Sequence, residues 1–185
     1  MNVPRLLTAR LTLRGFTAED FDEFAAMRAD AEVMRYIGLT GAQAREQSEA
    51  WLEKNRKRWA DEGFGMWAVT DRRDGRLLGW CGLSRLENTR EVELGYGLRR
   101  DAWGRGLTTE AARASVRYGF EEKSAGRIVA VAMPENTASR RVMEKLGMRY
   151  VRKDFFYGSG VVYYAIERDE FRAGDSPYTL ENSDE

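Results

Sequence analysis

The sequence predicts a mixed α/β domain, in which a mostly antiparallel sheet of about seven strands carries helices on both faces. Segments that alternate apolar and polar residues, as half-buried strands do, occur in both halves of the chain. Other segments repeat apolar residues at helical spacing. One helix-like segment lies between two strand-like segments, and such a unit requires one parallel, right-handed strand pair. The length of 185 residues fits one domain.

The first part of the chain is predicted to contain one strand and two helices. Residues 10–16 alternate as a strand does, and acidic residues crowd the start of the helix that follows Thr17. Glycines at both ends of the stretch 38–41 mark a break. A second helix is expected over 42–61, where apolar residues recur among many charges.

After Gly63 the apolar pattern changes from helix-like to strand-like. Three successive strands, with a hairpin turn at 72–76, lead into a glycine-containing loop and a helix. A further strand, a helix closed by Gly147 and a hairpin around 158–160 complete the predicted order. The expected elements are strands 64–71, 76–86, 91–98, 127–134, 150–157 and 161–171, with helices 107–121 and 136–147.

The domain is expected to span residues 1–172, followed by a frayed and disordered tail over 173–185. The tail contains acidic residues but no basic ones, and it has few apolar side chains to bury. It is therefore expected to add little to the core.

Composition excludes several classes of chemistry. Lys plus Arg and Asp plus Glu number 30 each, so the net charge of zero argues against a strongly basic nucleic-acid-binding surface. With no histidine and only Cys81 as a thiol, histidine-ligated metals, thiolate clusters and imidazole catalysis are excluded. No apolar run approaches the ~18 residues of a membrane span, and the first residues lack a secretory signal. We expect a cytoplasmic protein without metal, nucleic-acid or membrane partners.

Residues 102–114, AWGRGLTTEAARA, join a glycine-containing loop to the start of a helix. The first amides of a helix have no partner within it and lie at the positive end of its dipole, so this arrangement suits an anion. Gly104 and Gly106 allow the backbone to turn and to approach a ligand closely. The spacing fits neither a dinucleotide fingerprint, because position 109 is Thr, nor the phosphate loop of nucleoside triphosphatases. A tight turn without a ligand is the alternative.

The segments ELGYGLRRDAWGRGLTTEA (93–111) and PENTASRRVMEKLGM (134–148) together resemble the GNAT N-acetyltransferase superfamily. The similarity follows the order of elements over most of the chain, and it is greatest to the RimJ/RimL branch, which acetylates protein N-termini. In the superfamily motif Gln/Arg-x-x-Gly-x-Gly/Ala, Trp103 stands first, Gly106 in the middle and Thr108 last. Trp in the first place is similar to the RimJ/RimL branch, whereas Thr108 departs from the small residue of the motif.

The resemblance implies acetyl-CoA as the co-substrate and no metal. The loop and helix start would hold the diphosphate, and the strand before them would pair with the pantetheine arm. Two arginines would add charge near the phosphates, with solvated surface charges as the alternative. An asparagine resembles the family residue that binds the same arm, with a plain helix cap as the alternative. The implied acetyl-CoA-binding residues are Tyr96, Leu98, Arg99, Gly104, Arg105, Gly106, Leu107, Thr108, Thr109 and Asn136.

The implied reaction is acyl transfer from a thioester to an amine, and the amine must lose a proton. Glu93 stands where members of this branch commonly carry a catalytic acid, so it is the predicted general base. Glu91 lies on the same face of an alternating strand and is its competitor. Backbone amides near Gly95 and Tyr96 would stabilise the negative charge that develops on the carbonyl oxygen.

Ser139 is the predicted partner of the leaving sulfur. It follows Asn136 by one helical turn, where this branch places a hydroxyl near the thiolate. Many other superfamily members use a tyrosine that corresponds to Met143 here, so Ser139 or water must serve instead.

Three residues are predicted to bind the acceptor. Arg35 and Tyr36 lie between the first two helices, where the family forms part of the substrate channel, and Tyr157 lies beside the final hairpin turn. Cys81, in contrast, is predicted to be a core residue, because no base that could activate its thiol is in view.

The resemblance favours the N-terminal amine of a protein as the acceptor. A small amine, such as an amino acid, a polyamine or an antibiotic, is the alternative, because acceptor contacts lie on loops with no readable code. The sequence also allows a CoA-binding module without catalysis and, more remotely, a nucleotide-binding protein. It leaves open whether the protein is a monomer or a homodimer.

Overall fold

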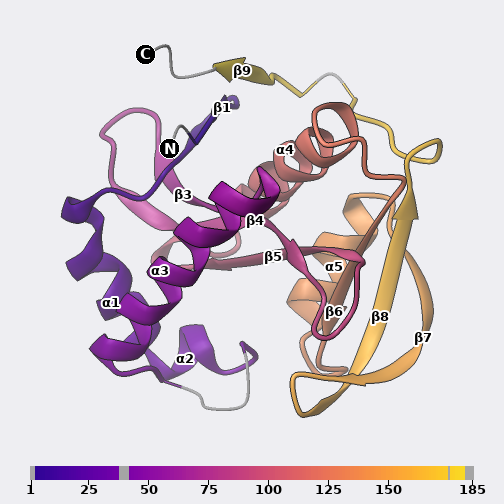
Figure 1. The fold of residues 1–185 in the computed structure, drawn as a ribbon, viewed down its shortest axis with the longest axis horizontal. Coiled ribbons are helices and arrows are strands. Elements are labelled where there is room, and N and C mark those ends of the chain that lie inside the picture. Colours follow the sequence, from indigo (N-terminus) through magenta and orange to yellow (C-terminus); the bar gives the residue numbers. More distant parts are fainter. Residues whose placement is uncertain (1–2, 38–41, 175, 182–185) are drawn as a thin grey trace.

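A computed structural model of the chain describes residues 3–37, 42–174 and 176–181. Within them, nine strands form one sheet in the order β7-β8-β6-β5-β4-β3-β2-β1-β9 (Figure 1). Neighbouring strands are antiparallel except for the parallel pair β5 and β6. The strands are β1 (Arg5–Leu7), β2 (Leu11–Arg14), β3 (Met66–Asp71), β4 (Leu77–Arg85), β5 (Val92–Leu98), β6 (Arg127–Ala132), β7 (Arg149–Phe156), β8 (Ser159–Glu167) and β9 (Thr179–Glu181).

Helices lie between the strands in the expected order. The predicted fold class is confirmed, and β5, α4 and β6 form the expected crossover, because β5 and β6 are the parallel pair. None of the described helices is long and apolar enough to cross a membrane. The helices are η1 (Ala18–Asp20), α1 (Phe21–Ala29), α2 (Ala31–Met34), α3 (Arg45–Glu62), η2 (Arg100–Ala102), α4 (Leu107–Glu121) and α5 (Thr137–Lys145).

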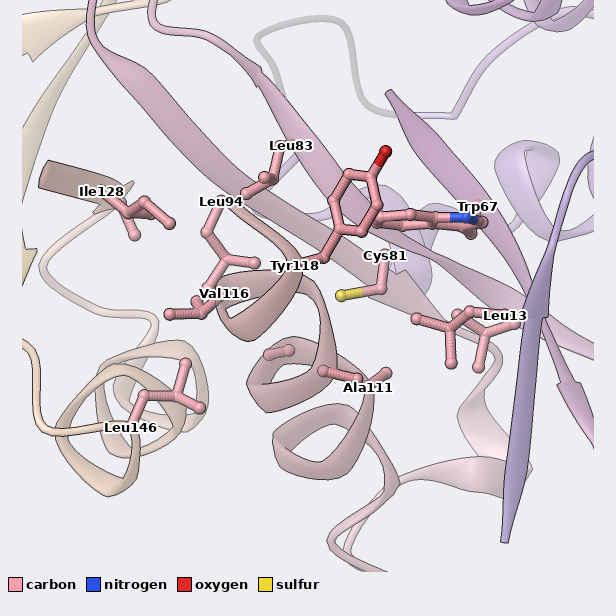
Figure 2. Packing of buried hydrophobic residues seen from close by; sticks show 14 of the residues in the cluster. Leu13, Trp67, Cys81, Leu83, Leu94, Ala111, Val116, Tyr118, Ile128 and Leu146 are labelled. Atoms are coloured by element: carbon pink, nitrogen blue, oxygen red, sulfur yellow. The ribbon is translucent and has the colours of Figure 1, made fainter. Parts of the chain in front are cut away.

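The two faces of the sheet pack against different helices. Along β3, Trp67 and Val69 belong to the larger apolar cluster, which includes α4 and α5, whereas Met66 and Ala68 belong to a second cluster with α1 and α3. Figure 1 shows α3 crossing in front of the sheet. Figure 2 shows the larger cluster, where the Trp67 and Tyr118 rings meet edge to face with centroids 5.0 Å apart. This alternation is the period-two pattern that predicted the strands.

Two glycines of β5 make room for side chains from the neighbouring strands. A Cβ on Gly97 would lie 2.4 Å from the Trp80 ring, and a Cβ on Gly95 would lie 2.7 Å from the Met66 side chain. Trp80 and Met66 therefore pack directly on the backbone of β5. This face of β5 also carries Glu93, two residues before Gly95, because side chains alternate along a strand.

The structure differs from the sequence expectation at the sheet edge and after the first helix. The helix expected after Thr17 is present as η1 and α1, and an additional short helix, α2, follows it. Asp30, with an extended ψ of 113°, separates the two and caps α2 by accepting from the amide of Glu32. The sheet contains the additional short strands β1 and β9. The break expected at 38–41 lies outside the described residues.

The tail also differs from the expectation of a disordered segment, because β9 pairs with β1. Leu180 lies opposite Leu6, and Leu6 is fully buried. Tyr178 and Leu180 pack against the larger apolar cluster. These two apolar side chains give the segment enough contact to order it as an edge strand.

The parallel pairing of β5 with β6 is short, and this positions the site. Val92 lies opposite Ile128 and Glu93 opposite Val129, and no later residue of β5 has a partner in β6. The remainder of the strand, Leu94–Leu98, is called here the unpaired part of β5, since it faces no strand on that side. Glu93 therefore lies at the point where the two strands diverge.

Candidate active site

The loop between β5 and α4 has the backbone expected of an anion-binding turn. Gly104 and Gly106 have φ angles of 71° and 76°, in the left-handed region that glycine adopts most easily. Gly106 is the N-cap of α4, and no side chain accepts a hydrogen bond there. The first amides of this 15-residue helix therefore remain available to a ligand, at the positive end of the dipole.

Two side chains hold this loop in place. The Trp103 indole nitrogen donates to the carbonyl oxygen of Leu98 at 2.6 Å, which folds the loop back onto the end of β5. The Arg10 guanidinium donates to the carbonyl of Arg105 at 2.9 Å and to the Glu110 carboxylate at 2.7 Å. The sequence pattern gave no sign of Arg10, because it lies on the chain before β2, far from the loop in sequence. The Glu110 carboxylate balances its charge, so Arg10 acts by holding the loop in place.

The predicted arginines occupy different surroundings. The Arg99 guanidinium forms ion pairs with Glu23 at 3.5 Å and Asp101 at 2.8 Å, so its charge is already balanced by carboxylates. Arg105 is exposed on the loop. Of the remaining loop residues, Leu107 is buried and anchors the helix, whereas Thr108 and Thr109 are half-buried in its first turn.

Glu93 is a buried carboxylic acid, with 7% of its surface exposed. Burial raises the pKa of Glu93 to about 7, against the opposing effect of hydrogen bonds from Tyr157 and Ser84. The charge of Arg58 also lowers this pKa, and that of Glu87 raises it. A carboxyl group that titrates near neutrality can accept a proton at physiological pH and release it afterwards.

The hydrogen bonds to Glu93 leave one carboxylate oxygen free. The Tyr157 hydroxyl donates to Oε2, and the Ser84 hydroxyl makes a longer contact of 3.5 Å with the same atom. No described residue donates to Oε1. The structure thus brings together Glu93 and Tyr157, two of the predicted site residues, although they are 64 positions apart.

Glu91, the competing base, has a different partner. The Tyr163 hydroxyl of β8 donates to the Glu91 carboxylate at 2.6 Å. Glu91 precedes β5 and is more exposed than Glu93. Its position lies farther from the unpaired part of β5 (Leu94–Leu98) than that of Glu93.

Two other predicted site residues, Tyr96 and Ser139, also meet in the structure. Their hydroxyl oxygens lie 2.8 Å apart, so the start of α5 is joined to the unpaired part of β5. Asn136 caps α5, because its side-chain oxygen accepts from the amide of Ser139 at 3.0 Å. The cap fixes the position of Ser139 at the start of α5.

Other predicted residues lie apart from Glu93. Arg35 stacks on the Tyr36 ring and pairs weakly with Glu32 at 3.9 Å, and no contact among the described residues links this pair to Glu93. Cys81 is fully buried against Ser115, and burial raises its thiol pKa to about 12. Its predicted place in the core is confirmed.

A cavity of about 390 Å³ lies at the other end of the parallel strands. Its lining includes Val92, Gly119 and Arg127 but not Glu93 or any residue of the β5–α4 loop. Among the described residues, no group of three acidic or cysteine side chains is placed to hold a metal ion.

The residues present fit acetyl-CoA in three ways. The amides of the β5–α4 loop and the helix start suit a diphosphate. The unpaired part of β5 leaves backbone donors and acceptors for an extended arm with amide groups. Glu93 directly precedes this stretch, and the Tyr96 hydroxyl within it meets Ser139, so polar side chains accompany the backbone groups.

Known proteins share the sequence pattern and the fold. The profile of the Acetyltransferase (GNAT) domain matches residues 10–149. YkkB of Bacillus subtilis, an uncharacterized protein, is 38% identical over 151 residues, which cover 79% of this chain and 86% of YkkB. A GNAT-family acetyltransferase from Bacillus anthracis superposes with a TM-score of 0.77 at 29% identity, covering 90% of this chain and 99% of that one. RimJ of Mycobacterium smegmatis, solved with CoA-disulfide, superposes with a TM-score of 0.71 at 22% identity, covering 92% and 88%.

Proposed function

The chain belongs to the GNAT family of acetyl-CoA-dependent N-acetyltransferases, and from that premise we propose that it acetylates the N-terminal amine of a protein. Glu93 is the general base of this reaction, and Ser139 supplies a hydrogen bond to the leaving sulfur. The observation that carries the proposal is the position of Glu93, a buried acid at the point where β5 leaves β6.

The ordinary pKa of an α-amine suits attack near neutral pH. An N-terminal amine titrates near ~8, whereas a lysine side chain titrates near ~10.4. Burial raises the pKa of Glu93 to about 7, so its carboxylate is available as a base in the same pH range. Near neutral pH, a useful fraction of α-amine is already neutral, so the base needs to remove a proton only as the new bond forms.

Each residue of the site has a part in the transfer. The amine nitrogen bonds to the carbonyl carbon of the acetyl group, and Glu93 Oε1 accepts the proton, directly or through one water. Backbone amides near Gly95 and Tyr96 stabilise the negative charge on the carbonyl oxygen. The carbon–sulfur bond then breaks while Ser139 donates a hydrogen bond to the sulfur. The thiolate takes a proton from solvent, and Glu93 returns its proton to solvent. The products are an acetylated amine and a free thiol.

Most of the contacts that bind the co-substrate are made to its diphosphate and its arm, away from the reacting thioester. Acetyl-CoA supplies the activated acetyl group when it is bound. The amides at the start of α4, together with Gly104 and Gly106, bind its diphosphate, and Arg10 holds the loop that carries them. The unpaired part of β5 orients the arm that ends in the thioester, so the acetyl group arrives at Glu93.

A panel of acceptors tests the proposal. The purified protein is incubated with acetyl-CoA and a peptide with a free N-terminus, and thiol release and peptide mass are measured. Both peptides contain an internal lysine, and the matched control differs only in its blocked N-terminus. Amino acids, polyamines and aminoglycosides complete the panel. We expect acetylation of the free N-terminus and none of the blocked peptide. Turnover confined to the small amines or to lysine would overturn the proposal.

A further inference from the structure

We infer that Tyr157 is a positioning residue for Glu93 and that Glu87 holds Tyr157 in place. The inference rests on the proposed function only in taking Glu93 as the base. It assigns to Tyr157 a role other than binding the acceptor, and it adds Glu87, which no sequence motif indicated. Three observations carry it: the left-handed backbone of Tyr157, the hydrogen bond from its amide to Glu87, and the hydrogen bond from its hydroxyl to Glu93.

The turn between β7 and β8 has an unusual residue in its first position. Phe156 pairs with Ser159, so the turn consists of Tyr157 and Gly158, whose φ angles are 54° and 73°. Two left-handed residues define the hairpin turn that strongly prefers Asn-Gly or Gly-Gly. Glycine adopts this backbone easily, but a tyrosine in it is strained. A local preference violated in this way points to a function for the side chain.

Glu87 provides a hydrogen-bond acceptor for the backbone amide of Tyr157 in this strained turn. The carboxylate of Glu87 accepts a hydrogen bond from the Tyr157 amide, which the two-residue turn does not itself use. Glu87 belongs to the turn between β4 and β5, whereas Tyr157 belongs to the turn between β7 and β8. The contact thus joins two hairpin turns that are 70 positions apart in sequence. It holds the tip of the second hairpin beside the strand that carries Glu93.

The side chain held in this way ends on the base. The Tyr157 hydroxyl donates to Glu93 Oε2, and burial together with the adjacent carboxylate raises the pKa of Tyr157, so the hydroxyl keeps its proton. The donor orients the carboxylate and leaves Oε1 for the acceptor. The other groups that act on Glu93 are Ser84 of β4, Arg58 of α3 and Glu87 itself. Tyr157 is the one described residue with a short hydrogen bond to this carboxylate.

A carboxylate titration tests the positioning without relying on turnover. The protein labelled with 13C at glutamate carboxyls is titrated by NMR, and Glu93 is assigned from its loss in Glu93→Gln. A hydrogen bond to the ionised form lowers a pKa. We therefore expect Tyr157→Phe, which keeps the ring, to raise the pKa of Glu93 by roughly one pH unit. An unchanged pKa in Tyr157→Phe would overturn the inference.

Two substitutions of Glu87 separate its charge from its hydrogen bond. Glu87→Gln and Glu87→Ala both remove the negative charge, which lowers the pKa of Glu93, but only glutamine still accepts from the Tyr157 amide. Glu87→Ala should also lose the Tyr157 hydrogen bond, so its Glu93 pKa should lie above that of Glu87→Gln. We expect kcat to fall roughly tenfold in Glu87→Ala and to stay close to the parent value in Glu87→Gln. Equal behaviour of the two variants would overturn the role of Glu87.

Tyr157→Asn controls for the turn itself. Asparagine suits the left-handed position, so this variant should fold with an unchanged or higher melting temperature. Like Tyr157→Phe it lacks the hydroxyl, so we expect kcat to fall in both variants. Parent-like kcat in Tyr157→Asn would show that the hydroxyl is not needed. If Tyr157→Phe moves the pKa of Glu93 but the pH profile of kcat/KM does not follow, then Glu93 is not the base, and the proposed function fails while the positioning stands.

Discussion

The hydroxyl oxygens of Tyr96 and Ser139 lie 2.8 Å apart, between β5 and the first turn of α5. The Tyr96 hydroxyl also lies 3.2 Å from the carbonyl oxygen of Ser139, to which it can donate. Burial raises the pKa of Tyr96 above the ordinary 10, so this hydroxyl stays protonated near neutral pH. Tyr96 therefore orients the Ser139 hydroxyl, which the proposed mechanism places at the leaving sulfur.

The pair should behave as one unit in catalysis. We expect Ser139→Ala to lower kcat roughly tenfold or more, because the sulfur loses a hydrogen-bond donor, with the Kd for acetyl-CoA nearly unchanged. Tyr96→Phe should have a smaller effect alone and none in the Ser139→Ala background. Thiol release at saturating acetyl-CoA gives kcat for the parent, the two single variants and the double variant. Independent, multiplying losses would show that the two hydroxyls do not act together.

Glu93→Gln should nearly abolish turnover while leaving acetyl-CoA affinity intact. Loss of a general base costs roughly 10²–10⁴-fold in rate. Since the carboxylate is the active form and the pKa of Glu93 is about 7, kcat/KM of the parent should fall as the pH drops below 7. The part of that limb due to Glu93 should be absent from the residual activity of the variant, which leaves only the titration of the amine near ~8. Parent-like kcat in Glu93→Gln at pH 6, 7 and 8 would remove Glu93 from the mechanism.

The same substitution should stabilise the fold, but only at higher pH. The pKa of Glu93 is about 7 in the folded chain against an ordinary 4.5, so the folded state holds the proton more tightly. Parent stability should therefore decrease as the pH rises from 4.5 to 7. At pH 8, Glu93→Gln should be more stable by an amount on the order of 3 kcal/mol, and at pH 4 the two proteins should match. Urea unfolding at both pH values measures the difference.

Gly106→Ala should weaken acetyl-CoA binding through backbone strain alone. An added Cβ would meet only the end of Arg10, at 3.6 Å, so space is available. The φ of 76° nevertheless costs an alanine about 1–2 kcal/mol, which corresponds to roughly tenfold in Kd if the loop shifts. Gly126→Ala is the matched control, because that glycine has open space and no positive φ. Calorimetric titration with acetyl-CoA should separate the two variants.

Asn55 should be important for stability, not for catalysis. Its side chain donates to the Met66 carbonyl at 2.9 Å and accepts from the Met66 amide at 2.8 Å, joining α3 to the start of β3. Asn55→Ala leaves a buried amide unpaired and should cost about 2–3 kcal/mol of unfolding free energy. Lys54→Ala, an exposed neighbour on the same helix, should change stability by less than about 0.5 kcal/mol. Urea denaturation compares them, and equal losses would contradict the assignment.

Elements with a long, one-faced apolar pattern could be predicted from sequence. The helix expected over 107–121 matches α4, because the glycine loop marks its start and its apolar residues share one face. The short strands β1 and β9 could not be predicted. Three residues show no readable alternation, and the pairing of β1 with β9 joins residues more than 170 positions apart. Edge pairing of this kind is decided by tertiary contact.

The site could be predicted where its residues lie close in sequence. The glycine loop and Glu93 share one continuous motif. The loop has left-handed glycines and Glu93 is buried, while their roles stay predictions. Ser84 could have been found by pairing the predicted hairpin strands, since it lies opposite Glu93. Glu87 and Arg10 could not, because their contacts join segments 70 and 95 positions apart through a turn and a loop.

Only two residue pairs join β5 to β6, so the two parts of the sheet meet along a weakly paired line. On one side lie β1–β5 and β9, on the other β6–β8, and α4 packs across both. A molecule that bonds to the backbone of Leu94–Leu98 would add cross-links where the protein has few. Amide hydrogen exchange along this stretch should slow markedly with coenzyme A present, and the rigidity of the whole sheet would then depend on its occupant.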